Sequence, residues 1–508
     1  MTVPDDGASL MEVLRDRLGI RSVKDGCSPQ GQCGCCTVWV DKKPRVSCVT
    51  PARRVAGRAI TTLAGLPEPV RTAWGDAFTA SGASQCGFCT PGIIMRLAAV
   101  SERSTADRAR SPVGSALAAH LCRCTGWQTI VEAADCLGRP GPPRDWGAAA
   151  RRAEIEGGAP QAVGSAVALG RGGFADDTAP EGALVALSDG RGGWAVGETV
   201  SEARAAAGRV QGRRTPVAAA PPLEFPEGEW AVRLRTSWVE PAYLETDASW
   251  CVPGGEPAGP LANGGAFGAK VTSPLPGVAR RLADEHGRTV RVLWSREDVV
   301  RHGPKRPPVA IGIAADGHGV IRVARTPGVA EAIGRVAPGL VVQEVDVAGP
   351  PTSVSIRGAG WVEAVVALSA LGDDTQPVTA PGGGSAVARW GPDGLGVQVW
   401  CGDPLDDIVV RSYCIGAAHM AYGWVTSEAL SVDLDGEIGD LTIRSFGVVP
   451  ASRMPPVTVA IQPSDGPPVN GSDAVFAAVA AATWRAAGHC PQWPTGPIDQ
   501  LEALSGRS

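Results

Sequence analysis

Eight of the chain's 14 cysteines fall into two sets of four within the first 124 residues. The first set has the spacing Cys27-x5-Cys33-x2-Cys36, with Cys48 further along, and several glycines lie between these cysteines. Disulfides, zinc and iron–sulfur clusters all use closely spaced cysteines. Glycines let the backbone close around a compact inorganic core and present N–H groups to its sulfurs. We therefore expect this set to bind a [2Fe–2S] cluster, and a zinc knuckle is the alternative.

The surroundings of this set favour a ferredoxin-like domain over residues 1–65. Its spacing is one residue longer than the x4-then-x2 spacing of plant-type [2Fe–2S] loops. Cys35 lies between two expected ligands, and we interpret it as a packing residue. Ahead of the loop, Ser9 and Glu12 make a capping-box pattern and leucines form one apolar stripe, which predicts a helix ending near Gly19.

The second set consists of two short pairs at predicted helix boundaries, Cys86-x2-Cys89 and Cys122-x-Cys124. Two antiparallel helices would bring these pairs together around a metal centre, which makes residues 66–140 a second, helical domain. A thioredoxin-like redox pair is disfavoured because the βαβ pattern is absent and C-x-C has no role in that fold. A four-cysteine zinc site stays open as the alternative.

Composition limits the compartment and the partners. The formal net charge is −5, with arginines and acids mixed along the chain, so no basic face for nucleic acid is predicted. No apolar run reaches the roughly 18 residues of a membrane span, and the start lacks the pattern of a signal peptide. So many cysteines without an export signal indicate a reduced compartment, and we expect a cytoplasmic protein. The six histidines do not cluster with acids, so none is expected to be catalytic.

The motifs "QCGFCTPG" and "LCRCTGW" carry a family resemblance. Residues 9–137 resemble the iron–sulfur domain of the molybdenum hydroxylases, the xanthine oxidase family. The resemblance implies a ferredoxin-like [2Fe–2S] domain followed by a second [2Fe–2S] cluster in a four-helix bundle. It also implies that Gln85 touches the pterin of a molybdenum cofactor.

The rest of the chain resembles the molybdopterin-binding subunit of that family more faintly. Residues 141–162 are rich in Pro, Gly and Arg and are interpreted as a linker. Residues 163–508 contain "NGGAFGAK" and "IRGAGW", which resemble loops beside the molybdenum. The resemblance places three residues there, namely Phe267, Gly268 and Arg357. The expected fold class is α+β throughout, with this last region as a shortened molybdopterin-binding type of domain.

Departures from the family suggest that residues 163–508 are degenerate. The family's molybdenum subunit is much longer, and its pterin-binding glycine–glutamine loops are not recognisable here. Ser472 stands where the family has a glutamate as general base, which leaves Asp473 as a weak candidate for that role. Val271 and Ala359 replace residues that contact substrate in some relatives. We expect no catalysis from this region.

The resemblance implies an iron–sulfur electron-transfer subunit of a larger oxidoreductase. Molybdopterin cytosine dinucleotide and FAD are then expected on partner subunits of a hetero-oligomer. Electrons would pass from a partner's molybdenum through the helical-bundle cluster and the ferredoxin-like cluster to FAD or another acceptor. The alternatives are a self-sufficient hydroxylase with its own molybdopterin site and a non-catalytic assembly scaffold.

Overall fold

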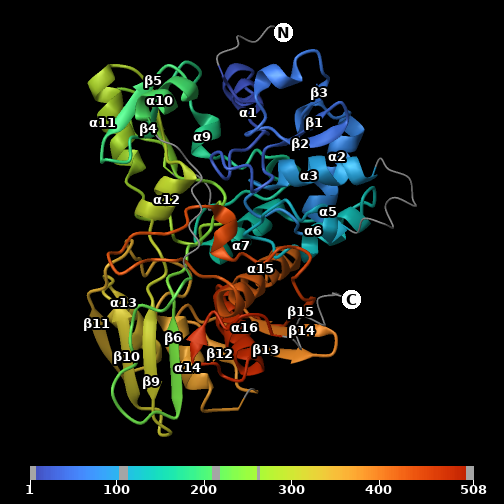
Figure 1. Cartoon of the computed structure of the whole chain (residues 1–508). Coiled ribbons are helices and arrows are strands. Elements are labelled where there is room, and N and C mark those ends of the chain that lie inside the picture. Colours follow the sequence, from blue (N-terminus) through green and yellow to red (C-terminus); the bar gives the residue numbers. More distant parts are fainter. Residues whose placement is uncertain (1–6, 102–112, 209–217, 260–263, 374, 499–508) are drawn as a thin grey trace.

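The computed structural model describes residues 7–101, 113–208, 218–259, 264–373 and 375–498. Helices and sheets alternate along the chain, so the predicted α+β class is confirmed. Figure 1 shows the N-terminal, cysteine-rich part as a lobe of its own, with one sheet beside it and two further sheets below.

The ferredoxin-like part has a small antiparallel sheet of three strands in the order β2-β1-β3. Its elements are α1 (Leu10–Glu12), the π-helical turn η1 (Val13–Arg17), β1 (Thr37–Val40), β2 (Lys43–Val46), η2 (Ala52–Val55), β3 (Ile60–Thr61) and η3 (Leu63–Gly65). Ser9 caps the helix as predicted, because its Oγ accepts the Glu12 N–H at 3.2 Å. The predicted regular helix nevertheless widens into a π-turn, in which Arg15 is buried and pairs with Asp176 at 2.6 Å.

Four helices follow and enclose the second cysteine set. They are α2 (Glu68–Ala80), α3 (Thr90–Ser101), α5 (Val113–Ala116) and α6 (Gln128–Asp135). Buried apolar residues of these helices form one core together with both cysteine sets. Because the thiols lie inside this core, water is excluded from both sites.

The segment expected to be a linker contains a buried helix, α7 (Trp146–Gly157). Asp145 caps it, and Gly158 ends it in the left-handed conformation. Its fully buried Arg152 and Glu156 pair at 2.8 Å, and the Glu156 carboxylate accepts the N–H groups of residues 471 and 472. The flanking prolines and glycines suggested an irregular tether, yet this helix packs against the C-terminal part of the chain.

Three sheets make up the remainder. The sheet of order β5-β4-β8-β7 comprises β4 (Leu184–Ser188), β5 (Trp194–Gly197), β7 (Ala248–Cys251) and β8 (Val290–Leu293). The sheet of order β11-β10-β9-β6-β16 comprises β6 (Val232–Thr236), β9 (Val309–Ile313), β10 (Gly319–Ala324), β11 (Leu340–Val345) and β16 (Gln492–Trp493). The sheet of order β12-β13-β14-β15 comprises β12 (Val378–Thr379), β13 (Ser385–Gly391), β14 (Gly394–Trp400) and β15 (Val457–Ile461).

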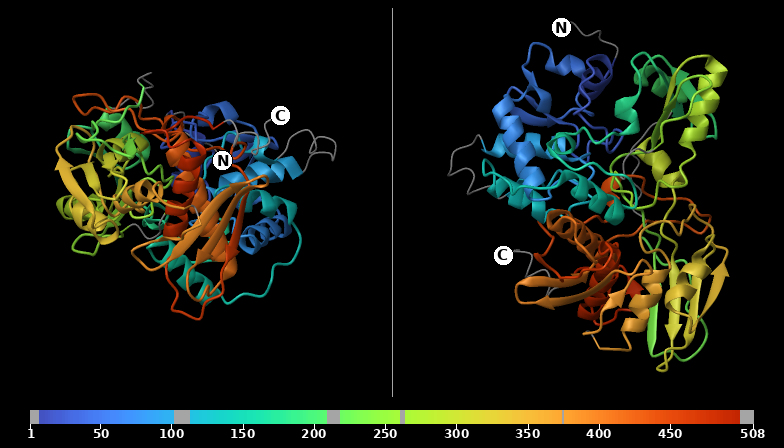
Figure 2. Two further views of the ribbon diagram at one scale, coloured as in Figure 1. Left: turned by 90° about the horizontal axis from the view of Figure 1, so that it is seen from below. Right: turned by 180° about the vertical axis from the view of Figure 1, so that it is seen from behind.

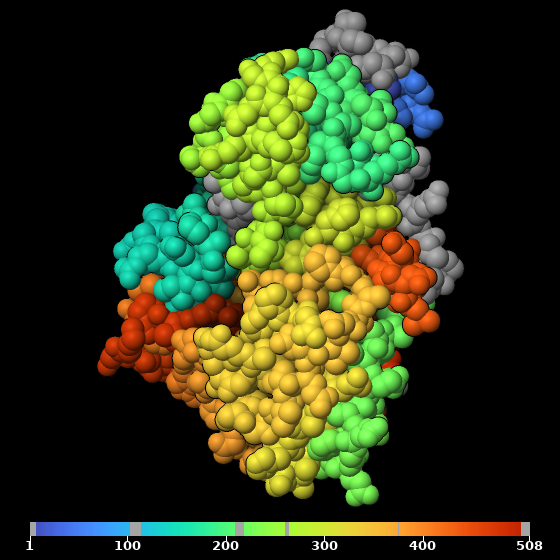
Figure 3. Space-filling view, turned by 90° about the vertical axis from the view of Figure 1, so that its left-hand side faces the viewer, coloured from blue at the N-terminus to red at the C-terminus, as the bar shows by residue number. Residues whose placement is uncertain are grey.

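Helices cover these sheets and separate them. They are α8 (Ser165–Ala168), α9 (Ala175–Thr178), α10 (Val200–Ala207), α11 (Leu275–His286), α12 (Arg296–His302), α13 (Val329–Val336), α14 (Trp361–Ser369), α15 (Asp407–Thr426), η4 (Ile443–Phe446) and α16 (Ser472–Ala486). From behind, the lobe carrying α10 and α11 stands next to the N-terminal lobe (Figure 2). In the space-filling view of Figure 3, the same lobe, in green and yellow-green, lies above yellow atoms, the colour of the residues around 300–350 that include β9 to β11.

The long helix α15 lies between the N-terminal lobe and the C-terminal sheets. Nearly all of its side chains are buried, because the bundle, α7 and α16 contact it from different sides. A helix that is apolar all round belongs inside a core. The iron–sulfur-type lobe and the C-terminal region therefore form one packed body.

Candidate metal centres

The first cysteine set is assembled by the hairpin of β1 and β2. Val40 pairs with Lys43, so the chain reverses within two residues and returns Cys48 to the side of Cys36. The N–H and hydroxyl of Ser47 donate to the Cys36 carbonyl at 3.2 and 2.8 Å. The hairpin thus places the fourth, distant cysteine next to the loop that carries the other three.

The thiol of Cys27 lies at the centre of hydrogen bonds within this set. The thiols of Cys33 and Cys48 donate to it and hold its pKa well below the usual range. The N–H groups of Gln30 and Gln32 also point at its sulfur, at 3.2 and 3.4 Å. Donors to sulfur stabilise a thiolate, which is the form that binds iron.

The second set brings its two short pairs together across the bundle. The sulfurs of Cys86 and Cys124 are 3.5 Å apart, and Cys89 contacts Cys122. Hydrogen bonds from Cys89 and from Thr125 lower the pKa of Cys122 to about 6. These donors favour the thiolate of Cys122, which is the form that binds a metal.

The geometry of both sets favours a cluster over a single ion. Within the described ranges, no three His, Cys, Asp or Glu side chains converge as they would around one metal ion. The thiols of the first set form a chain of neighbours instead, in which Cys33 contacts Cys27, Cys27 contacts Cys48 and Cys48 contacts Cys36. Four cysteine thiolates are the usual ligand set of a [2Fe–2S] cluster, and the residues of both sets would fit such a cluster.

The two sets are direct neighbours, which the sequence did not reveal. The N–H of Leu121, the residue before Cys122, donates to the Cys33 carbonyl at 3.0 Å. A Cβ on Gly92 of α3 would lie 2.3 Å from the Gly34 carbonyl, so only glycine lets the helix approach the first loop this closely. A short covalent and hydrogen-bonded path thus joins the two sites.

Three residues predicted to lie beside molybdenum come together with Asp473 in the C-terminal region. The N–H of Arg357 donates to the Phe267 carbonyl at 3.0 Å, and its guanidinium lies 4.0 Å from the centre of the Phe267 ring. Gly268 follows with a φ of +94°, where a Cβ would lie 1.7 Å from the Ser355 carbonyl. Arg357 also donates to Ser472 Oγ at 2.8 Å and pairs with Asp473 at 2.9 Å.

The space around these side chains does not accommodate a pterin. The cavity lined by Phe267, Arg357 and Phe476 has a volume of about 40 Å³, enough for a few water molecules. Burial raises the pKa of Asp473, and Arg357 opposes this shift. The residues expected beside the metal bind one another and leave less space between them than a molybdopterin fills.

Gln85 is enclosed by the chain itself. Its side-chain N–H donates to the Cys124 carbonyl at 2.9 Å and to Ser412 Oγ of α15 at 3.1 Å. Its carbonyl oxygen is buried without a protein partner and borders a cavity of about 10 Å³. The predicted contact of Gln85 with a pterin stays a prediction, since α15 covers this side chain.

The C-terminal region contacts the loop of the second cysteine set through an ion pair and through a close approach of helix α15. The guanidinium of Arg123, between two ligand cysteines, binds Glu428 with both nitrogens at 2.6 and 2.7 Å. A Cβ on Gly416 of α15 would lie 1.7 Å from the Cys124 carbonyl. In the predicted arrangement, a molybdenum centre lies next to this site. In the structure, the chain's own helix α15 occupies that face.

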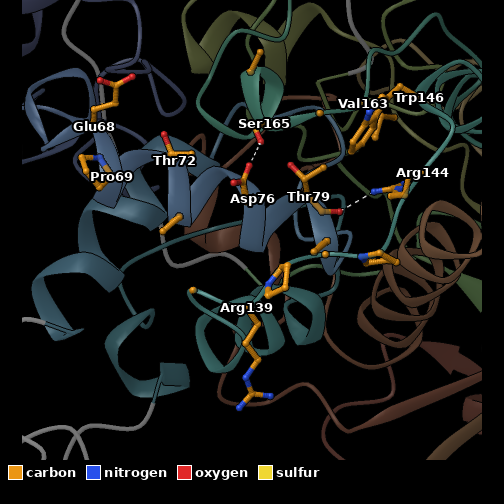
Figure 4. Close-up of a pocket in the computed structure, with 18 residues that line it drawn as sticks. Glu68, Pro69, Thr72, Asp76, Thr79, Arg139, Arg144, Trp146, Val163 and Ser165 are labelled. Atoms are coloured by element: carbon orange, nitrogen blue, oxygen red, sulfur yellow. Dashed lines mark hydrogen bonds between the residues drawn. The ribbon is translucent and has the colours of Figure 1, made fainter.

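A cavity of about 960 Å³ has no cysteine in its lining (Figure 4). It is bordered by α2 and by residues 138–146 and 163–166. Its polar groups bind each other: Ser165 donates to Asp76 at 2.7 Å, and Arg144 donates to the Thr79 carbonyl at 2.8 Å. Within the described residues, no helix has the length and apolar character needed to cross a bilayer.

Comparison with known proteins matches the N-terminal quarter most strongly. Residues 62–135 match the model of the [2Fe-2S] binding domain family. The "Xanthine dehydrogenase iron-sulfur-binding subunit" of Escherichia coli O157:H7 is 41% identical over 133 residues, which are 26% of this chain and 82% of that protein. The "Aldehyde oxidoreductase" of Megalodesulfovibrio gigas is 42% identical over 137 residues, which are 25% of this chain and only 14% of that relative.

Solved structures extend the likeness of fold to the whole chain. The aldehyde oxidoreductase from Desulfovibrio gigas superposes with a TM-score of 0.67, covering 100% of this chain and 98% of that chain at 15% identity. The enzyme from Desulfovibrio desulfuricans gives a TM-score of 0.68 at 14% identity. At these identities the likeness concerns the arrangement of elements alone.

Proposed function

The chain belongs to the molybdenum hydroxylase family, and from this premise we propose that it is an iron–sulfur electron-transfer subunit of such an oxidoreductase. One observation carries the proposal: two buried sets of four thiols lie side by side and are joined through Leu121 and Cys33. When bound there, [2Fe–2S] clusters accept and release single electrons.

The chain's own residues hold and shield these centres. All eight ligand cysteines are at most 5% exposed, which keeps water from the sulfurs. The N–H donors of Gln30 and Gln32 stabilise negative charge on Cys27, and a thiolate-poised Cys122 favours metal binding in the bundle. Free thiols at all 14 cysteines support a cytoplasmic location.

In the proposed electron-transfer path, electrons enter the protein at the helical-bundle site and leave from the ferredoxin-like site. The donor is a molybdenum centre with molybdopterin cytosine dinucleotide on a partner subunit, and the acceptor is FAD on another subunit or a separate carrier. Residues 163–498 cover the bundle site in this proposal. They are non-catalytic, because Arg357 binds both Ser472 and Asp473. A partner must therefore approach the bundle beside α15.

A second candidate is a self-sufficient hydroxylase. One observation favours it, since Phe267, Arg357 and Asp473 gather near the bundle site in a fold like that of a complete aldehyde oxidoreductase. It requires the cavity of about 40 Å³ to open far enough for a pterin.

Metal analysis separates the two candidates. Iron, sulfide and molybdenum are measured on the purified chain, alone and after purification together with proteins encoded by neighbouring genes. Four irons and no molybdenum in the isolated chain, with molybdenum found only in a complex, support the electron-transfer subunit. Stoichiometric molybdenum in the isolated chain establishes the second candidate, and a chain without iron contradicts both.

A further inference from the structure

A cavity of about 690 Å³ lies where the ferredoxin-like part meets the segment that follows α8. Its lining comes from residues 19–22 after η1, from η3 and the first turn of α2, and from residues 169–178. Small-molecule sites in proteins usually have volumes of about 300–1,000 Å³, so this cavity has the size of a ligand site. None of the described residues that line it is a cysteine, and the proposed electron-transfer path does not use it.

The charged side chains of this lining are mainly basic. Three arginines line the cavity, namely Arg21, Arg71 and Arg171. Asp177 is the one acidic residue in the described lining, and its carboxylate already binds Lys24 and, at 3.0 Å, Arg15. The charge of Asp177 is thus compensated within the protein, which leaves the three guanidiniums in excess.

These guanidiniums have few partners of their own. The contact of Arg21 with Asp16 is long, at 3.4 Å. Arg71 donates to the neutral carbonyl of Ala64 at 3.0 Å. Within the described part of the chain, the exposed side chain of Arg171 has no hydrogen-bond or ion-pair partner. The cavity therefore offers guanidinium donors to an anion.

Apolar side chains and one unpaired hydroxyl complete the lining. Ile20, Leu63 and Leu169 contribute aliphatic surface. Ile20 and Leu169 are only partly buried, so a ring placed over them would remove apolar surface from water. Ser22 also lines the cavity, and its Oγ is buried without a hydrogen-bond partner among the described residues. A buried polar atom left unpaired is costly, and a bound molecule would satisfy it.

The wall formed by the segment after α8 is held in place by buried contacts. Lys24 Nζ donates to the Gly170 carbonyl at 2.7 Å, and Thr90 Oγ1 donates to the Ala168 carbonyl at 2.6 Å. A Cβ on Gly170 would lie 2.6 Å from Pro91 Cγ, so the segment packs tightly on α3. Because this wall is fixed before a ligand arrives, binding costs little conformational entropy.

We propose that this cavity binds a small aromatic carboxylate. Guanidiniums bind carboxylates through paired hydrogen bonds and stack on aromatic rings, and the aliphatic side chains cover the rest of the ring. The bound acid joins the ferredoxin-like part to residues 169–178, because both contribute arginines to the lining. The site goes beyond the proposed function and does not depend on it.

The test uses 2-naphthoate as the probe and the purified full chain. Calorimetric titration compares this probe with 2-naphthalenemethanol, which keeps the rings without the charge, and with inorganic phosphate, which keeps a charge without the rings. Arg171→Gln removes one guanidinium, and Ser22→Ala removes the unpaired hydroxyl. Arg389→Gln removes an exposed arginine of β13 and is the matched control. Iron content and the melting temperature without probe show whether each variant keeps its fold.

We expect 2-naphthoate to bind once per chain with a dissociation constant below about 1 mM, and to raise the melting temperature because it binds the folded chain. Each of the two partial probes should bind at least about tenfold more weakly, and Arg171→Gln should weaken 2-naphthoate binding about tenfold. Ser22→Ala should weaken binding without lowering the melting temperature of the free protein, since this hydroxyl has no protein partner to lose. Arg389→Gln should leave the affinity within about twofold.

Equal binding of 2-naphthalenemethanol overturns the proposal, because the arginines then do not select an anion. Equal binding of 2-naphthoate by Arg171→Gln also overturns it, as does the lack of saturable binding at about 1 mM. Iron is measured on the same samples. A chain that carries both clusters and does not bind the probe contradicts this site alone, whereas a chain without iron contradicts the proposed function alone.

Discussion

Arg357 and Asp473 form an ion pair, with 2.9 Å between Nε and Oδ1, at the position where the family resemblance predicted a catalytic base. The same guanidinium binds Ser472 Oγ and the Glu156 carbonyl, so it joins α16 to α7. The Asp473 carboxylate is therefore a structural partner of Arg357. The contacts of this arginine explain why the cavity beside it is small.

Replacing this arginine tests its structural role. Arg357→Met should lower the free energy of unfolding by about 2–4 kcal/mol, because a buried carbonyl, a hydroxyl and a partly exposed carboxylate lose their donor. Thermal unfolding of the variant and the wild type gives the difference. Iron content should not change, since no ligand cysteine contacts Arg357. Loss of iron in a stably folded Arg357→Met protein would contradict the separation of the two regions.

The assignment of the bundle ligands predicts a simple iron count. Cys89→Ser should reduce iron from four to two per chain and leave the ferredoxin-like cluster's electron paramagnetic resonance signal in place, because each cluster needs all four thiolates. Cys35→Ser is the matched control, since that thiol is buried beside Cys33 yet is not an expected ligand. Loss of iron in Cys35→Ser would instead make that cysteine a ligand.

The buried pair between Arg123 and Glu428 should anchor the loop of the bundle cluster. Glu428→Ala leaves a guanidinium uncompensated at a site where the two side chains are 7% and 1% exposed, at a cost of about 3–5 kcal/mol. We also expect the variant to lose bundle iron faster in the presence of a chelator. Glu331→Ala removes an exposed pair with Arg335 and should change stability by less than about 1 kcal/mol.

Replacing each of two helical glycines by alanine should have opposite effects on stability, because only one of them lies at the close contact between α15 and the bundle. Gly416→Ala should destabilise the chain and disturb the bundle cluster, because the new Cβ would overlap the Cys124 carbonyl. Gly334→Ala in α13 meets no atom within 4 Å and should stabilise by up to about 1 kcal/mol through higher helix propensity. Thermal unfolding measures both changes, and equal effects would argue against this contact.

A buried carboxyl predicts how stability changes with pH. Burial raises the pKa of Glu245 to about 7, although Lys270 lies 2.7 Å away and opposes this shift. The folded chain therefore keeps a proton that the unfolded chain has released, so the stabilising contribution of Glu245 is present below about pH 4.5 and is lost as the pH rises to about 7. The size of the loss is about 3 kcal/mol. Melting temperatures of wild type and Glu245→Gln across this range should show the steeper decline in the wild type.

Local chemistry made the N-terminal quarter predictable from sequence. The spacing around Cys27 and Cys86 predicts ligands of a compact cluster, and the structure brings the thiols of each set together. Their binding of iron stays a prediction. The strand and helix of residues 194–207 also follow their local pattern, since β5 and α10 occupy them. In each case the deciding interactions lie within a few tens of residues of one another.

Long-range contacts account for what the sequence left hidden. Arg152 and Glu156 lie in a Pro- and Gly-rich segment interpreted as a linker, but they are fully buried. Helix α15 packs on α7, and the N–H of Ser472, the first residue of α16, donates to Glu156. The partnership of Arg123 with Glu428 spans 305 positions and carries no local signature. Only the folded chain shows that Arg357 takes both Ser472 and Asp473 as partners.

The cover that α15 places on the bundle loop has a consequence for biogenesis. Gly416 follows Cys124 by 292 positions, so a ribosome finishes all four bundle ligands long before it makes the helix that buries them. At about 5–20 residues per second, synthesis leaves an interval of roughly 15–60 seconds during which α15 does not yet cover the thiols. Maturation factors that deliver iron and sulfide must act in that interval, or else wait for α15 to swing away from the finished protein.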